Sequence, residues 1–105
     1  MRYLLNAPVI GTYGDYRFEG PLALDVARTF AAQQMQSAIG HAGTADFLTE
    51  RLGVPVVCRR DAIRMLPGDQ ALVLRLLTRL PEGVVLDAEA LATVAHEFAL
   101  LTRLR

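Results

Sequence analysis

The stretch SAIGHAGTADFL, residues 37–48, places His41 between two glycines at a point where a loop gives way to a predicted helix. The N-terminus of a helix offers unpaired backbone N–H groups and a partial positive charge, and glycine allows an anion to approach them closely. A histidine in this position can act as a general acid toward a bound phosphodiester. It can equally be a turn or capping residue, so the stretch by itself leaves both interpretations open.

Arginines gather at the ends of two predicted strands. Arg59 and Arg60 end VPVVCRR, and Arg75 and Arg79 lie four residues apart in LVLRLLTRL. A guanidinium grips phosphate through two parallel hydrogen bonds, so these residues and His41 form a set suited to a phosphate site without a metal. On the other interpretation they are surface charges that keep the sheet soluble.

The motifs of the common enzyme classes are missing from the sequence. We find no P-loop, no dinucleotide glycine fingerprint, no nucleophile elbow and no acidic metal cluster, and the cysteine and histidines lack zinc-site spacing. No cofactor and no metal are therefore predicted. Cys58 lies in an apolar run and is expected to pack as a small hydrophobic residue, and His96 is interpreted as structural.

The composition describes one compact domain over residues 1–105. Hydrophobic residues make up 52% of the chain, enough for a core of its own. Eleven arginines balance eleven carboxylates and lysine is absent, so the chain lacks the basic field of a protein that coats duplex nucleic acid. The first apolar run meets Asn6 and Pro8 too early for a signal peptide or a membrane span, and one cysteine fits a reducing cytoplasm.

Hydrophobic periodicity predicts alternating strands and helices. Apolar runs with β-branched residues indicate strands, whereas apolar positions that recur at helical spacing after a capping residue indicate helices. Asp25 and Asp87 are the expected caps, and Gly53 is an expected helix end. The last segment, 98–105, either continues the final helix or forms one more strand. The predicted strands are 2–10, 54–60, 71–80 and a short edge strand at 16–18, and the predicted helices are 25–36, 45–52 and 87–98.

These elements predict an α/β fold with a central mixed β-sheet of about five strands flanked by helices, in two or three layers. A sheet this small, in a chain this apolar, leaves a hydrophobic face uncovered until two copies meet. We therefore expect a single small domain that forms a homodimer.

Four short motifs occur in the order and spacing of a known family: YLLNAP at the start, SAIGH in the middle, and TRLPEG followed by LLTR near the end. The chain resembles the viral anti-CRISPR ring nucleases of type III systems, whose bacterial members are called ring nuclease two, and the resemblance spans essentially the whole length. It implies a homodimeric, metal-independent phosphodiesterase. The implied substrate is cyclic tetra-adenylate, the second messenger of type III CRISPR systems, and the implied products are linear di-adenylates with a 2′,3′-cyclic phosphate.

The resemblance assigns roles to individual residues of this chain. His41 would protonate the departing 5′-oxygen after attack by a ribose 2′-hydroxyl of the ring itself. Arg79 would stabilise transition-state charge and Glu82 would orient the site, while Pro81, at a position where family members vary, stiffens the approach to Glu82. The implied substrate-binding residues are Asn6 and Ala7 in the adenylate pocket, Ser37, Ile39 and Gly40 in the loop beneath the phosphate, and Arg60 on a phosphate.

Two alternatives from other classes stay open. The same pocket can hold a cyclic oligoadenylate without cutting it, as a sponge or sensor, or the chain can be a small dimeric protein that binds nucleic acid or another protein. The balanced charge gives the second alternative little support. Tyr13 and Tyr16, in a loop outside the matched motifs, are candidates for an adenine-stacking lid. For a virus-encoded member, the expected location is the cytoplasm of the host cell.

Overall fold

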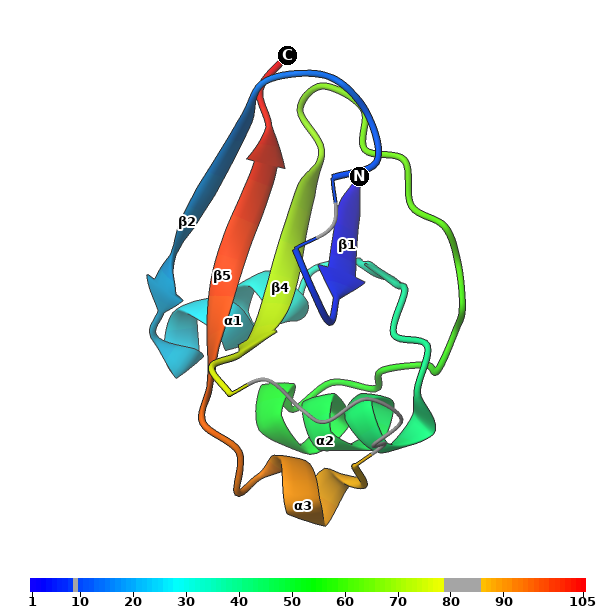
Figure 1. The fold of residues 1–105 in the computed structure, drawn as a ribbon, viewed down its shortest axis with the longest axis vertical. Helices are drawn as coiled ribbons and strands as arrows, with labels where there is room; N and C mark the ends of the chain where they lie inside the picture. Colours follow the sequence, from blue (N-terminus) through cyan, green and yellow to red (C-terminus); the bar gives the residue numbers. More distant parts are fainter. Residues whose placement is uncertain (9, 79–85) are drawn as a thin grey trace.

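A five-stranded mixed sheet forms the centre of the molecule in the computed structural model, which describes residues 1–8, 10–78 and 86–105 (Figure 1). The strand order is β2-β5-β4-β1-β3. β1 runs parallel to both β3 and β4, whereas β5 runs antiparallel to β4 and β2. The strands are β1 (Arg2–Leu5), β2 (Tyr16–Leu22), β3 (Gln36–Ser37), β4 (Gln70–Leu76) and β5 (His96–Arg103), and the helices are α1 (Leu24–Ala31), α2 (Ala42–Leu52) and α3 (Ala88–Leu91).

The side chains of the central strands alternate between two apolar cores, because successive residues of a strand point to opposite faces. Leu4 and Leu72 belong to the larger core, to which all three helices contribute. Tyr3 and Val73 belong to the smaller core, which is covered by Met65 of the long loop before β4. The predicted α/β fold, a mixed sheet of five strands with three helices, is confirmed.

Most predicted elements exist but have different bounds. α2 begins at Ala42, three residues before the predicted start, and ends as predicted at Gly53, whose φ of 74° is left-handed. α1 is capped by Ala23 rather than by Asp25, which lies in its first turn, and it ends at Ala31 because β3 follows at Gln36. The first strand stops at Leu5, the edge strand extends from Tyr16 to Leu22, and the strand predicted at 71–80 ends at Leu76.

Three predictions about local structure are wrong. The segment 54–60 is no strand, since its one sheet contact is a single parallel bridge between Ile39 and Cys58 beyond the two-residue β3. Cys58 is exposed on this outer segment and is not packed in the core. The helix predicted over 87–98 ends at Leu91, although its cap is correct, because the Asp87 carboxylate accepts a hydrogen bond from the Ala90 N–H at 2.8 Å. The last segment is therefore the strand β5.

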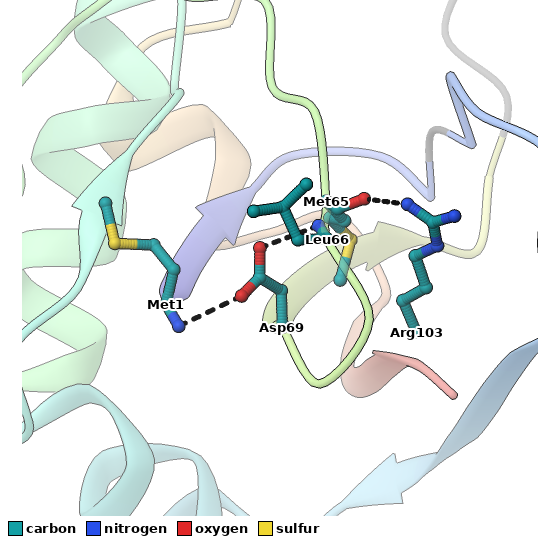
Figure 2. Close-up of polar contacts among 5 residues, drawn as sticks. All are labelled: Met1, Met65, Leu66, Asp69 and Arg103. Carbon is teal, nitrogen blue, oxygen red and sulfur yellow. Dashed lines mark hydrogen bonds and ion pairs between the residues drawn. The ribbon is translucent and has the colours of Figure 1, made fainter. Parts of the chain in front are cut away.

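Asp69 joins three distant parts of the chain at the amino end of β4 (Figure 2). Its buried carboxylate accepts hydrogen bonds from the Met1 amino group at 3.0 Å and from the Leu66 N–H at 2.8 Å. Arg103, at the end of β5, donates to the Met65 carbonyl at 2.5 Å. Burial alone would raise the pKa of Asp69, but these hydrogen bonds and the charges of the Met1 amino group and Arg103 outweigh burial and lower that pKa.

Candidate functional site

The carboxyl ends of β3, β1 and β4 lie at one edge of the sheet, because these strands are parallel neighbours. Ligands of open α/β sheets bind in the crevice beyond such ends. Asn6 and Ala7 follow β1, and the loop of residues 38–41 follows β3. Arg79 and Glu82, the predicted arginine and glutamate of the site, come shortly after β4 and lie outside the described residues.

His41 is the N-cap residue of α2, but its imidazole does not cap the helix. The backbone at His41 is extended, with φ −126° and ψ 131°, and its carbonyl accepts a hydrogen bond from the Ala45 N–H at 3.0 Å. The side chain is exposed and makes no capping hydrogen bond, and the first turn of α2 contains no acidic residue. The imidazole is therefore exposed, and the first turn itself contains no carboxylate that could pair with its N–H groups.

The loop that leads to His41 is held by side-chain to backbone hydrogen bonds. The Ser37 hydroxyl donates to the Val57 carbonyl at 2.7 Å and accepts from the Ile39 N–H at 3.3 Å. Ile39 is fully buried and anchors the loop in the core. The Arg60 Nε donates to the Gly40 carbonyl at 3.1 Å, one residue before His41. These contacts of Ser37, Ile39 and Arg60 fix the backbone that leads to His41.

A hollow of about 550 Å3 lies between the ends of β1 and β4. Asn6, Ala7 and Pro8 line one side of it, and residues 74–78 line the other. The structure therefore brings the predicted pocket residues Asn6 and Ala7 against the strand that leads into Arg79. Residues 37–41 do not line this hollow, since they follow the neighbouring strand β3.

Arg75, one of the arginines proposed for a phosphate site, lines this hollow but has its charge paired with a carboxylate. Its guanidinium forms an ion pair with Glu97 of β5 at 2.7 Å. Both residues sit opposite each other in the β4–β5 register. Arg75 thus fits the surface-charge interpretation rather than the phosphate-binding one.

Gly43 and Thr78 are site residues that sequence reasoning missed. A β-carbon on Gly43 would lie 2.9 Å from the Asp87 Cα and still closer to the Leu86 carbonyl oxygen, so only glycine allows the chain entering α3 to approach the first turn of α2. A glycine inside the first turn of a helix is the signal for such a contact. Thr78 lines the hollow, and its place directly before Arg79 in TRLPEG was the signal for it.

His96 has contacts that agree with a structural role. Its ring lies edge-on to Phe47 of α2, with 5.1 Å between ring centroids, and its Nδ1 is 2.8 Å from the Val94 carbonyl. Among the described residues, no three His, Cys, Asp or Glu side chains gather in a way that could hold a metal ion. In the same part of the chain, no helix is long and apolar enough to cross a bilayer.

Fold and site together define a small α/β protein with a candidate anion site at the carboxyl ends of three parallel strands. A family profile described as STIV B116-like matches residues 2–98, so the chain belongs to the STIV B116-like family.

Relatives of this chain occur in a bacterium and in viruses. Uncharacterized protein YddF of Bacillus subtilis (strain 168) is 33% identical over 103 residues, which cover 95% of this chain and 94% of YddF. Uncharacterized protein ORF117 of Acidianus two-tailed virus is 43% identical over 53 residues, 50% of this chain and 45% of ORF117. The solved structure of B116 of Sulfolobus turreted icosahedral virus has a TM-score of 0.70 at 20% identity over 97% of this chain and 98% of that one, and so shares the fold.

Proposed function

We propose that this protein is a metal-independent ring nuclease that opens cyclic tetra-adenylate and thereby ends type III CRISPR signalling. The observation that carries the proposal is the position of His41. Its exposed imidazole stands at the N-terminus of α2 without serving as a cap, beside a first helical turn that contains no acidic residue. An imidazolium in that position can donate a proton next to a bound phosphodiester.

In the proposed reaction the ring supplies its own nucleophile. The scissile phosphate binds against the first turn of α2, and the adjacent ribose 2′-hydroxyl attacks the phosphorus. The 2′-hydroxyl releases its proton to water as a bond forms between the 2′-oxygen and phosphorus, the bond from phosphorus to the 5′-oxygen breaks, and His41 protonates the departing 5′-oxygen. The product carries a 2′,3′-cyclic phosphate at one end and a 5′-hydroxyl at the other, and no step requires a metal.

The other motif residues support this chemistry in the proposal. Arg79 stabilises the transition-state charge and Glu82 orients the site from the segment that follows β4. Asn6 and Ala7 hold an adenylate in the hollow between the ends of β1 and β4. Arg60, which donates a hydrogen bond to the Gly40 carbonyl, binds a phosphate of the ring.

A homodimer completes the proposal. Two copies related by a two-fold axis present two His41 side chains to opposite phosphodiesters of the cyclic tetranucleotide. Two cuts therefore give two identical di-adenylates. Exposed apolar side chains such as Phe18, 46% exposed on the edge strand β2, and Ile10, 57% exposed, provide surface that a second copy can cover.

A single-turnover experiment separates the enzyme from a sponge or sensor. Protein in excess is mixed with labelled cyclic tetra-adenylate, the protein is then denatured, and the recovered ligand is analysed by chromatography. The enzyme is expected to return linear di-adenylate. Recovery of intact ring from a complex that bound it tightly would contradict the proposed activity and identify a sponge or sensor, and absence of both binding and cleavage would exclude cyclic tetra-adenylate as the ligand.

A further inference from the structure

A second hollow lies at the opposite, amino-terminal edge of the three parallel strands and has a volume of about 690 Å3. Its polar lining comes from the starts of β1, β3 and β4 and from the segment after the Cys58 bridge. The lining side chains that matter here are Arg2, Arg59, Gln34, Gln36 and Gln70. None of the residues assigned to the ring nuclease chemistry contributes to it.

Arg2 is the cation of this hollow whose charge is left uncompensated. Its Nε is buried and has no hydrogen-bond partner among the described residues. Its guanidinium carbon lies 5.6 Å from the centroid of the Phe30 ring, a cation–π contact that holds the group in place without using its N–H donors. The buried Nε itself is out of reach of a ligand, but no side-chain N–H of Arg2 donates to another described residue, so the terminal N–H groups of the guanidinium are left to bind one.

The other charges at this edge are already paired. Arg59 forms an ion pair with Asp61 at 2.6 Å. The Met1 amino group is 3.0 Å from the Asp69 carboxylate, which also accepts a hydrogen bond from the Leu66 N–H. Neither carboxylate therefore neutralises Arg2, and the described part of the hollow carries a net positive charge.

We infer that this hollow is a binding site for a small phosphate monoester with a hydroxylated body, such as a sugar phosphate. Arg2 binds the phosphate, because a guanidinium matches an oxyanion through charge-assisted hydrogen bonds. Gln34, Gln36 and Gln70 offer amide donors and acceptors for hydroxyl groups. The volume is within the range of small-molecule sites and is larger than a phosphate ion needs. The inference does not depend on the proposed function, because the two sites occupy opposite edges of the sheet.

The test is a titration of the 15N-labelled full chain with ribose 5-phosphate, monitored by NMR through the arginine Nε–H and glutamine amide resonances. We expect saturable shifts of the Arg2 Nε–H and of the three glutamine amides, with weaker binding of inorganic phosphate and none of ribose. Arg2→Met keeps the aliphatic stem against Phe30 and is expected to weaken binding at least about 10-fold, the loss of a charge-assisted hydrogen bond. Gln34→Ala, at an exposed position, is expected to weaken it by a few-fold and provides a second variant if Arg2→Met does not fold.

Arg17→Met is the matched control, because it removes the same charge from an exposed position on β2, at the other side of the sheet. Binding should be unchanged in this variant. Equal losses in Arg17→Met and Arg2→Met would overturn the inference in favour of general electrostatic attraction. Absence of saturable shifts with ribose 5-phosphate at millimolar concentration would overturn it as well, and equal binding of inorganic phosphate would overturn the assignment to an ester.

Discussion

Arg59 and Arg60 are adjacent in the chain, but their side chains lie at different places: one lines the amino-terminal hollow and the other contacts the loop before His41. Arg60 donates to the Gly40 carbonyl at 3.1 Å and so is tied to the loop of His41. Arg59 lines the amino-terminal hollow and is paired with Asp61 at 2.6 Å. The two arginines therefore offer a matched pair of substitutions.

Arg60→Gln is expected to weaken binding of cyclic tetra-adenylate by about 10-fold, because a charged group that holds the Gly40 loop and faces a phosphate is lost. Arg59→Gln is the control and should leave the affinity unchanged. The measurement is the Kd of cyclic tetra-adenylate, determined by titration with each substitution combined with His41→Ala, so that the ring is bound but not cleaved. Equal Kd values for the two variants would contradict a specific role for Arg60.

His41→Ala is expected to slow single-turnover cleavage of the ring by about 10²- to 10⁴-fold while leaving its Kd nearly unchanged, as for loss of a general acid. His96→Ala is the control histidine variant. It removes edge-on ring contacts with Phe47 and Phe98, so it should lower the free energy of unfolding by about 1 kcal/mol and leave the cleavage rate of the folded protein intact. Equal cleavage by wild type and His41→Ala would exclude His41 as the acid.

At the scale of elements, the first turn of α2, which follows His41, contacts Leu86 and Asp87 at the start of α3. Gly43, two residues after His41, permits this contact, since a β-carbon there would lie 2.9 Å from the Asp87 Cα. Asp87 in turn caps α3 through the Ala90 N–H. The geometry of the helix N-terminus is therefore coupled to that of residues 86 and 87, which lead into α3.

Gly43→Ala is expected to lower the free energy of unfolding by about 1–3 kcal/mol, the cost of overpacking, and also to slow cleavage. Gly53→Ala is the matched control. Gly53 has φ 74°, so alanine there costs about 1–2 kcal/mol, but its β-carbon would meet open space far along α2 from His41. Urea unfolding and single-turnover rates should show a stability loss in both variants and a rate loss only in Gly43→Ala. A rate loss of the same size in Gly53→Ala would contradict the coupling.

The sequence predicted the elements whose formation depends on local chemistry and missed those that depend on tertiary pairing. Gly53 ends α2 and Asp87 caps α3 as expected, because a left-handed glycine and a capping carboxylate act within a few residues. His96 to Arg103 has an apolar pattern that also fits a helix, and it becomes a strand because β4 and β2 pair with it on both sides. Such pairing cannot be read from a single segment.

In the candidate site, too, the features that depend on local sequence were predicted and those that depend on tertiary structure were not. His41 was placed at a helix start by its neighbours in the chain, and the structure puts it at the N-cap of α2. The hollow between the ends of β1 and β4 depends on strand order, as does the close approach of Gly43 to Asp87. Neither strand order nor close approach between distant segments has a local sequence pattern, so neither was predicted.

At the scale of the whole molecule, the hydrogen bonds around Asp69 tie together Met1 just before β1, the turn before β4 and the end of β5 (Figure 2). The pKa of Asp69 is lower in the folded chain than in the unfolded one, so its ionised form stabilises the fold. That contribution is fully present above the unfolded pKa, about 4, and is lost as the pH falls through the lower folded pKa.

Asp69→Asn keeps the shape of the side chain and removes the charge, so it is expected to lower the free energy of unfolding by about 1–3 kcal/mol at neutral pH. The difference from wild type should shrink as the pH falls below about 4, where the wild-type carboxylate becomes protonated. Urea unfolding between neutral and acid pH provides the measurement, with Asp15→Asn at an exposed position as the control. A difference that is independent of pH would contradict the role given to the Asp69 charge.

The central claim concerns the chemistry at His41, and the identity of the reaction products tests it most directly. Purified protein is mixed with labelled cyclic tetra-adenylate in excess chelator, and the products are followed by chromatography and mass spectrometry. The account predicts linear di-adenylate with a 2′,3′-cyclic phosphate, which requires attack by the ribose 2′-hydroxyl and no metal. Intact ring under these conditions, or cleavage that appears only when a divalent cation is restored, would contradict it.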